Sequence, residues 1–273
     1  MIDRYAVIGH PISHSKSPLI HGLFAQATGQ TLEYTALEAP LDGFKATVES
    51  FRAQGGRGLN VTLPFKLQAF EIATDPMASA RLAGAVNALK FEGDRILAQN
   101  FDGLGLVNDI QRNLGVSLAG KRVLICGAGG ATRGAIVPLA EQKPAVIAIA
   151  NRSADKAHGL KADFSAQVAL QTGGYEDLAG ESFDVVLNAT STGLSQAALP
   201  LPTGVFAPGA LAYELVYGKG LTPFLKQAQA AGVIRIADGV GMLVEQAAEA
   251  FEWWRGVRPD TQPVIARLTV PLV

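Results

Sequence analysis

The stretch KRVLICGAGGATRGAIVPLAEQKPAVIAIANRSADKA, residues 121–157, decides the fold. An apolar run at 123–126 leads into a glycine turn, then a helical pattern, and then a second apolar run. A strand that turns through glycines directly into a helix is the context of dinucleotide sites in parallel α/β sheets. Gly127 permits the tight turn, and Gly129 and Gly130 allow a pyrophosphate to approach the backbone at the helix N-terminus.

The residues after the second apolar run indicate which cofactor fits. The G-x-G-x-x-G pattern is not fully met, because Thr132 stands at its sixth position, so a glycine-rich turn without a ligand is an equal alternative. An NAD site usually has Asp or Glu after the second strand, to bind the ribose 2′-hydroxyl. Here Asn151 and Arg152 stand there, and a guanidinium binds a 2′-phosphate bidentately. We therefore predict NADP; the alternative for Arg152 is a solvated charge at a helix start.

Helices alternate with short strands along the chain, which predicts an α/β protein. An apolar run at 5–8 and the patterns at 31–37 and 58–62 predict strands, with helical patterns between them. Residues 103–238 contain the glycine turn and further βα units, so they are predicted to form a Rossmann-like nucleotide-binding domain. A helix predicted at 244–254 lies beyond that domain.

Composition bounds the class of protein. The 273 residues suffice for one large or two modest domains, and 48% hydrophobic residues supply a sizeable core. A formal charge of −1 gives no reason to expect nucleic acid or an anionic membrane as a partner. One cysteine, Cys126, excludes an internal disulfide, and no Cys/His cluster has metal-ligand spacing. Without a leader or a membrane-length apolar run, we predict a soluble, cytoplasmic protein that binds no metal.

Polar residues near strand ends and helix starts form candidate sites in the first hundred residues. Ser15 and Ser17 precede a helical pattern, where they either cap the helix or bind a carboxylate. Asn60 and Thr62 are two apart on a predicted strand and therefore project from one face. Lys66 lies in the first turn of the next helix, where the helix dipole disfavours a cation. The alternative for Lys66 is an ordinary surface lysine.

Two further polar residues are out of character for their predicted surroundings. Asn87 is predicted inside an apolar strand, as either a satisfied core amide or a ligand contact. Asp102, in QNFDGLG at 99–105, stands between a strand and a helix, so it is either a helix cap or a functional carboxylate. His14 and His21 lack a carboxylate or cysteine at ligand spacing and are interpreted as helix-flanking residues.

Eight motifs in register make the chain resemble the shikimate dehydrogenase family over nearly its whole length. They are GHPISHSKSPLIH, NVTLPFK, AGAVNAL, NFDGLGL, GAGGATRGA, NRSADKA, NATSTGL and GVGMLVEQAAEAF. The resemblance implies a reversible, NADPH-dependent reduction of 3-dehydroshikimate to shikimate, in chorismate and aromatic amino-acid biosynthesis. It implies two α/β domains with a cleft between them: a substrate domain, 1–102, completed by C-terminal helices at 239–273, and the NADP-binding domain at 103–238. The expected partner is a small-molecule substrate, and the expected state is a monomer or homodimer.

The resemblance also implies roles for individual residues. Lys66 and Asp102 match the family's catalytic pair, and which of them transfers the proton stays open, because coupled groups titrate as a pair. Its substrate contacts are matched by Ser15, Ser17, Asn60, Thr62, Asn87, Tyr217 and Gln246. Its cofactor contacts are matched by Gly127, Ala128, Gly129, Gly130, Ala131, Asn151, Arg152, Ser153, Thr190, Gly239 and Met242.

Three residues depart from the family's usual pattern. Phe101 and Ala88 stand where the family usually has threonine, and Glu214 stands where it usually has aspartate. Phe101 either packs into the core or lines the substrate pocket, which leaves the choice between shikimate and quinate open.

The alternative functions are a quinate/shikimate dehydrogenase using NAD or NADP, a methylenetetrahydrofolate dehydrogenase/cyclohydrolase, and a non-enzymatic NADP-binding regulator.

Overall fold

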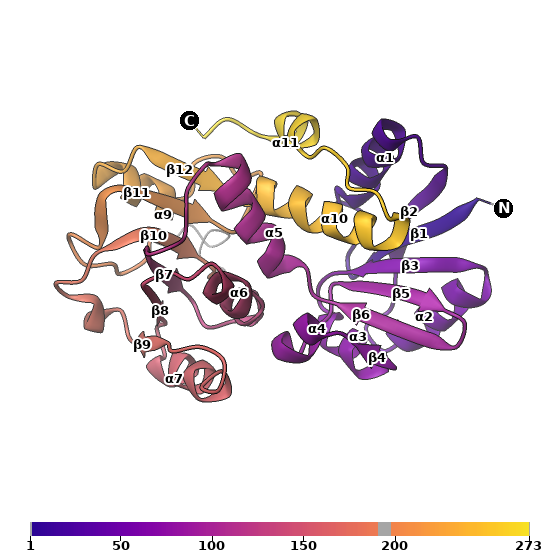
Figure 1. The fold of residues 1–273 in the computed structure, drawn as a ribbon, viewed down its shortest axis with the longest axis horizontal. Helices are drawn as coiled ribbons and strands as arrows, with labels where there is room; N and C mark the ends of the chain where they lie inside the picture. Colours follow the sequence, from indigo (N-terminus) through magenta and orange to yellow (C-terminus); the bar gives the residue numbers. More distant parts are fainter. Residues whose placement is uncertain (1, 191–197, 273) are drawn as a thin grey trace. The chain divides into compact units, whose positions relative to one another are not determined.

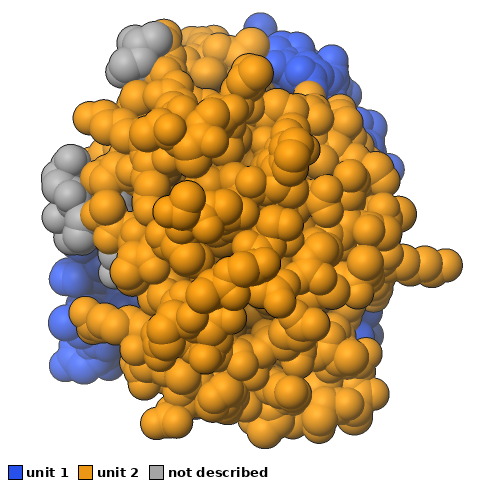
Figure 2. All heavy atoms as spheres, turned by 90° about the vertical axis from the view of Figure 1, so that its left-hand side faces the viewer, with its two compact units in different colours: residues 1–105, 244–264 blue, residues 106–243, 265–273 orange. Residues whose placement is uncertain are grey.

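The structure is a computed structural model that describes residues 2–190 and 198–272. The chain forms two compact units (Figure 2). Unit 1 consists of residues 1–105 and 244–264, and unit 2 of residues 106–243 and 265–273. Within the described residues, no helix combines the length and the apolar character that a membrane crossing requires.

The predicted domain boundaries differ from the limits of these units. The chain enters unit 2 inside helix α5 (Asp102–Asn108) and returns inside α10 (Val240–Arg255), a few residues after each predicted boundary. Residues 265–273 group with unit 2, not with the N-terminal part as predicted. The physical reason is that Leu272 packs against the hydrophobic core of unit 2.

Unit 1 is built on a mixed sheet with the strand order β2-β1-β3-β5-β6-β4 (Figure 1). β1, β2 and β3 run parallel, whereas β5 is antiparallel to both β3 and β6. The elements are β1 (Asp3–Gly9), α1 (Ser17–Thr28), β2 (Leu32–Glu38), α2 (Phe44–Ala53), β3 (Gly56–Val61), α3 (Lys66–Ile72), β4 (Asp75–Pro76), α4 (Ala78–Ala83), β5 (Ala88–Glu92), β6 (Arg95–Gln99) and the ends of α5 and α10.

Helices cover both faces of this sheet. On one face, α2, α3 and α4 pack apolar side chains against the strands, including the stacked rings of Phe44 and Phe65. On the other face, α1 and α10 meet in an aromatic cluster, in which Tyr5 stacks on Trp254 with 4.8 Å between ring centroids. Gly58 must be glycine here, because a Cβ would lie 2.7 Å from the Trp254 indole nitrogen.

Unit 2 is a parallel sheet with the order β12-β11-β10-β7-β8-β9. Numbered within the unit, this is the 3-2-1-4-5-6 order of dinucleotide-binding sheets, and the order reverses between β7 and β10. The elements are η1, a π-helical turn (Asp109–Asn113), β7 (Arg122–Cys126), α6 (Gly130–Glu141), β8 (Val146–Ala150), α7 (Ala154–Asp163), β9 (Gln171–Gly173), η2 (Glu176–Leu178), β10 (Phe183–Asn188), β11 (Phe206–Glu214), α9 (Pro223–Ala230), β12 (Arg235–Asp238) and most of α11 (Gln262–Leu268).

Two local predictions need correction. Asn87 lies one residue before β5, not inside a strand, although its N–H donates to Gln99 and its carbonyl accepts from Val61. His21 does not flank α1 but lies inside it. The residue is 1% exposed, because its ring stacks on that of Tyr34 with 4.1 Å between the ring centroids. In both cases a partner distant in the sequence sets the position.

Candidate active site and cofactor site

Lys66 and Asp102 form an ion pair at the centre of a polar cluster in unit 1. Lys66 is the first residue of α3, and Asp102 is the first residue of α5. Lys66 Nζ donates to Asp102 Oδ2 at 2.5 Å, and the two side chains are 28% and 17% exposed. A partly desolvated ammonium–carboxylate pair can hold a proton and pass it to a bound group.

Asn87 connects this pair to α10. Its Nδ2 donates to Asp102 Oδ1 at 2.9 Å and to Gln246 Oε1 at 3.2 Å. Its Oδ1 accepts from the Phe101 N–H at 2.8 Å. The amide therefore orients the catalytic candidate Asp102 and the substrate candidate Gln246 together.

The position of Asp102 is explained by these contacts rather than by helix capping. Its own N–H donates to Asn100 Oδ1 at 3.1 Å, so Asn100 supplies the local turn at the start of α5. The two carboxylate oxygens of Asp102 accept from Lys66 and Asn87. The geometry favours the functional carboxylate.

Asn60 is held by a residue that the sequence did not indicate. The Tyr34 hydroxyl donates to Asn60 Oδ1 at 2.7 Å, and Asn60 Nδ2 donates to the Asn87 carbonyl at 3.3 Å. Burial raises the pKa of Tyr34 well above its usual value, with a smaller opposing effect of Ser17, so the phenol stays a donor. Tyr34 lies on β2, and no local pattern shows that β2 brings it near Asn60.

The two candidate serines differ in their surroundings. Ser15 Oγ accepts from the Ser17 N–H at 3.3 Å, but the N-cap position of α1 is Lys16, which makes no side-chain cap hydrogen bond, so neither serine caps the helix. Ser17 is the first helical residue and is buried, with Tyr34 close by. Thr62 follows β3 directly and is half-buried. Tyr217, the remaining substrate candidate, belongs to unit 2 and is 40% exposed.

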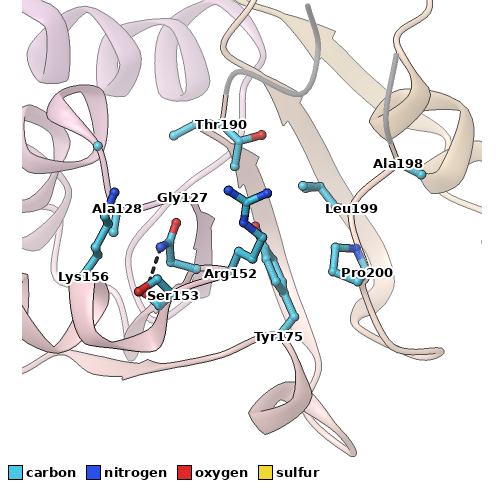
Figure 3. Close-up of a pocket in the computed structure, with 13 residues that line it drawn as sticks. Gly127, Ala128, Arg152, Ser153, Lys156, Tyr175, Thr190, Ala198, Leu199 and Pro200 are labelled. Carbon is cyan, nitrogen blue, oxygen red and sulfur yellow. Dashed lines mark hydrogen bonds between the residues drawn. The ribbon is translucent and has the colours of Figure 1, made fainter. Parts of the chain in front are cut away.

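A cavity of about 590 Å³ lies at the carboxyl ends of β7, β8 and β10 in unit 2 (Figure 3). This is the point where the strand order reverses, and open α/β sheets bind ligands at such points. Seven predicted cofactor residues line it: Gly127, Ala128, Gly129, Asn151, Arg152, Ser153 and Thr190. Gly130 and Ala131 begin α6 directly beside it.

The turn after β7 requires glycine at its first position. Gly127 has φ +108°, and a Cβ there would lie 3.0 Å from the Thr190 methyl carbon. Thr132, at the sixth position of the motif, is fully buried, and its Oγ1 donates to the Gly127 carbonyl at 2.8 Å. The residue that departs from the glycine pattern thus ties α6 to the end of β7.

The next two glycines leave space open for a ligand. A Cβ at Gly129 or Gly130 would meet no protein atom within 4 Å, so packing of the chain itself does not require glycine there. Both lie at the N-terminus of α6, where backbone N–H groups and the helix dipole favour an anion. The turn therefore fits a pyrophosphate group.

Two cations lie on the side of the cavity formed by α7. Arg152 and Lys156 are exposed and line it, while the Asn151 side chain donates to the Ser153 carbonyl at 2.9 Å (Figure 3). Sequence reasoning missed Lys156, although a cation in the first turn of a helix is the signal that pointed to Lys66. Two cations and no lining carboxylate among the described residues fit a 2′-phosphate better than a 2′-hydroxyl.

The last cofactor candidates lie in different surroundings. A Cβ at Gly239 would lie 2.2 Å from the Leu215 carbonyl oxygen, so the chain's own packing requires this glycine. The Met242 N–H donates to the Tyr213 hydroxyl at 3.3 Å. Neither Gly239 nor Met242 is among the described residues that line the cavity. The end of the NATSTGL motif, 191–194, lies outside the described residues. The described residues contain no group of three or more His, Cys, Asp or Glu side chains that could hold a metal ion.

Comparison with protein families decides the family. Three models match: shikimate dehydrogenase substrate binding domain at 7–89, shikimate / quinate 5-dehydrogenase at 109–196, and shikimate 5'-dehydrogenase C-terminal domain at 239–269. The chain belongs to the shikimate dehydrogenase family. The three matched ranges cover parts of both units.

Individual relatives cover the whole chain. The shikimate dehydrogenase (NADP(+)) of Dechloromonas aromatica (strain RCB) is 56% identical over 273 residues, 100% of both chains. The crystal structure of an Ael1 enzyme from Pseudomonas putida is 59% identical with a TM-score of 0.96, covering 99% of this chain and 100% of that one. Shikimate 5-dehydrogenase from Thermus thermophilus, in complex with NADP(H) and shikimate, is 31% identical with a TM-score of 0.86, covering 97% and 98%.

Phe101 packs into the core of this family member. Its ring is 7% exposed and meets Trp253 edge to face, with 5.8 Å between centroids. It shares one cluster with Ala88 and Ala250. Ala88 is the second residue that departs from the family's usual threonine, so the two departures occupy the same cluster.

Proposed function

We propose that this protein catalyses the reversible, NADPH-dependent reduction of 3-dehydroshikimate to shikimate, the step that serves chorismate and aromatic amino-acid biosynthesis. The observation that carries the proposal is the Lys66–Asp102 pair within a cluster of amide side chains in unit 1. The family supplies the reaction class, and full-length relatives bear the name shikimate dehydrogenase (NADP(+)).

The substrate is a small anion that carries hydroxyl groups, so it needs a compact polar site. Ser15 and Ser17, at the start of α1, bind its carboxylate with help from the helix N-terminus. The hydroxyls are bound by Asn60, Thr62, Asn87 and Gln246, and the family resemblance assigns Tyr217 to the same set of substrate residues. This assignment is supported by the hydrogen bonds that hold Asn60, Asn87 and Gln246 in one cluster with Asp102.

The Lys66–Asp102 pair handles the proton of the reaction. NADPH, when bound, supplies the hydride that reduces the carbonyl carbon. Negative charge then develops on the carbonyl oxygen, and the Lys66 ammonium stabilises that charge and donates the proton. Asp102 orients Lys66 through the 2.5 Å bond and accepts a hydrogen bond from a substrate hydroxyl. In the reverse direction the same pair takes the proton back.

NADP is the cofactor that the cavity of unit 2 fits. Gly127, Gly129 and Gly130, with Ala128 and Ala131, hold the pyrophosphate. Arg152, Lys156 and Ser153 hold the 2′-phosphate, and Asn151 shapes their turn. The family resemblance assigns Thr190, Gly239 and Met242 to segments that flank the nicotinamide. The open space at Gly129 and Gly130 supports the placement of the pyrophosphate.

A dehydrogenase acting on quinate as well as shikimate is the second candidate. It is favoured by the family model of residues 109–196, which describes shikimate / quinate 5-dehydrogenases. Absorbance of the reduced nicotinamide, followed with shikimate and quinate against NADP and NAD, separates the candidates. We expect turnover with shikimate and NADP; a preference for quinate or NAD supports the second candidate, and no turnover in any combination supports a non-enzymatic NADP-binding protein.

Replacing Lys66 tests its place in the mechanism. We expect Lys66→Ala to lower kcat about 100-fold, the low end of general acid–base contributions, with little change in shikimate binding. Lys90→Ala is the matched control, because the Lys90 side chain is also 28% exposed and pairs with Glu92. Turnover of Lys66→Ala close to that of Lys90→Ala would remove Lys66 from the mechanism.

Cytoplasmic location and a monomeric or homodimeric state stay predictions. Cell fractionation and sedimentation of the purified protein test them independently of the reaction.

A further inference from the structure

Glu214 is a fully buried carboxylate at the end of β11, the strand that pairs with β10 beside the cofactor cavity. Three donors from the described residues face it. Asn188 Nδ2 and Thr222 Oγ1 donate to Oε2 at 2.8 and 3.0 Å, and the Val216 N–H donates to Oε1 at 3.3 Å. Burial raises the pKa of Glu214, while these hydrogen bonds oppose the rise. Both oxygens thus accept hydrogen bonds, which suits an ionised carboxylate.

Asn188 connects Glu214 to Thr190 through the two ends of its side-chain amide. Asn188 is fully buried, and its Oδ1 accepts from the Thr190 N–H at 3.1 Å and from Thr190 Oγ1 at 2.6 Å. An amide has one oxygen end and one nitrogen end. Because Glu214 binds the nitrogen end, the oxygen end must face Thr190.

Thr190 in turn forms part of the cofactor cavity (Figure 3). Its methyl carbon lies against the turn at Gly127, where a Cβ would be 3.0 Å away. The rotamer and backbone of Thr190 thus shape the cavity beside the first glycine of the motif.

We propose that Glu214 is a positioning residue for the cofactor: it fixes the amide orientation of Asn188 and thereby holds Thr190 in the conformation that NADP binds. The proposal rests on the proposed function of the cavity. It gives the family's usual acidic position, occupied here by glutamate, a role in cofactor binding that acts through Asn188 rather than through direct contact.

Glutamine is the informative replacement, because it keeps the size of Glu214 but not its two acceptor oxygens. Whichever way its amide turns, one –NH2 faces a donor. With the new –NH2 toward Asn188, a turned Asn188 relieves the conflict, but its nitrogen end then faces the Thr190 N–H. We expect Glu214→Gln to raise the Kd for NADP about tenfold, close to the loss of one charge-assisted hydrogen bond, and to leave the KM for shikimate unchanged.

Thr222→Val is the matched control. Thr222 donates to the same carboxylate oxygen and caps α9, accepting from the Leu225 N–H, so its side chain bonds to the carboxylate without continuing to Thr190. We expect this variant to lower the melting temperature and to change the Kd for NADP by less than about twofold. In the variant Thr190→Val, the further change Glu214→Gln should alter the Kd for NADP by less than about twofold, because the hydrogen bond from Thr190 Oγ1 to Asn188 is already lost.

The Kd is measured by calorimetry with NADP alone, without turnover. If the unmodified protein binds no NADP, the proposed cofactor site fails. If it binds NADP and Glu214→Gln binds equally well while its melting temperature falls, Glu214 is only structural and the positioning role is overturned. Should Glu214→Gln not fold, Asn188→Ala replaces it, because it removes the amide through which Glu214 acts. It should raise the Kd about tenfold, and an unchanged Kd overturns the proposal.

Discussion

Phe101 lies next to Asp102, yet its ring is directed to packing rather than to the substrate. The ring fills space between Ala88, Ala250 and Trp253. We expect Phe101→Thr to lower the free energy of unfolding by about 3 kcal/mol, as large-to-small core changes do. The ratio of kcat/KM for shikimate over quinate should change less than about threefold, because the ring is 7% exposed. Urea unfolding and steady-state assays measure the two effects.

The double variant Ala88→Thr/Phe101→Thr is the control for this interpretation. It restores the family's usual pair and partly refills the cluster, so it should be more stable than Phe101→Thr alone. A tenfold change in substrate preference with unchanged stability would instead place the ring at the substrate.

His21 makes the stability of unit 1 depend on pH. Burial lowers its pKa to about 3, against a smaller opposing effect of Asn60, and neither ring nitrogen has a hydrogen-bond partner in the described part of the chain. Below its usual pKa of about 6.5, the unfolded chain takes up a proton that the folded chain does not. Stability is therefore full above pH 6.5 and is lost as the pH falls toward 3.

Replacing His21 by phenylalanine removes this titration and keeps an aromatic ring in the cluster. Relative to pH 7, the unmodified protein should lose about 2 kcal/mol more at pH 5 than His21→Phe does. Urea unfolding at the two pH values measures the difference. His14→Gln is the matched control, because His14 is an exposed histidine on the same unit. An identical pH dependence in His21→Phe would show that His21 is not responsible.

At the scale of elements, Arg258 ties the chain that follows α10 back onto that helix. The guanidinium pairs with Glu245 at 2.6 Å and with Glu249, and Glu245 also accepts from Thr261 at 2.6 Å. Glu245 is 1% exposed, so Arg258→Ala would leave a buried charge short of its cation. We expect a loss of about 3 kcal/mol in the free energy of unfolding, measured with urea.

The third partner of Arg258 supplies the comparison. Glu252 lies 3.2 Å away and its side chain is 47% exposed, so Glu252→Gln should cost less than about 1 kcal/mol. Equal losses in Arg258→Ala and Glu252→Gln would mean that burial of Glu245 does not determine the effect.

The elements that could be predicted from the sequence are those with local signals. The turn at Gly127 follows its own strand and opens its own helix, so the pattern shows both. The local pattern places Asn87 inside a strand, because its non-local partners, Gln99 and Val61, leave no trace in the neighbouring residues. For the same reason, the local pattern does not show whether Asp102 is a helix cap or a functional carboxylate, since its position is set by hydrogen bonds to Lys66 and Asn87.

The same limit explains which site residues the sequence missed. Tyr34 reaches Asn60 only through the pairing of strands, and the three donors around Glu214 come from β10, the start of α9 and the chain after β11. Such contacts depend on sheet order, which spacing along the chain does not encode. Lys156 is the exception, because its place at a helix N-terminus was visible.

At the scale of the whole molecule, each unit carries its own hydrophobic core and its own candidate site. The core of unit 1 gathers side chains such as Phe44, Phe65 and Leu89, and that of unit 2 gathers others, such as Phe183, Tyr175 and Phe224. A ligand stabilises the unit that binds it by about 2.7 kcal/mol at a hundredfold excess over Kd. Because each core consists of residues of one unit, a ligand should slow amide hydrogen exchange most in the unit that binds it.

Hydrogen exchange with each ligand in turn tests this division. NADP should slow exchange most in the turn after β7 and at the start of α7, and shikimate should slow it most at the start of α1 and around Asn60 and Lys66. Arg152→Ala should weaken the protection by NADP and leave that by shikimate unchanged, because the lost cation lies in unit 2. Protection spread evenly over both units by either ligand would contradict the assignment of one site to each, since the stabilisation would then be a property of the whole chain.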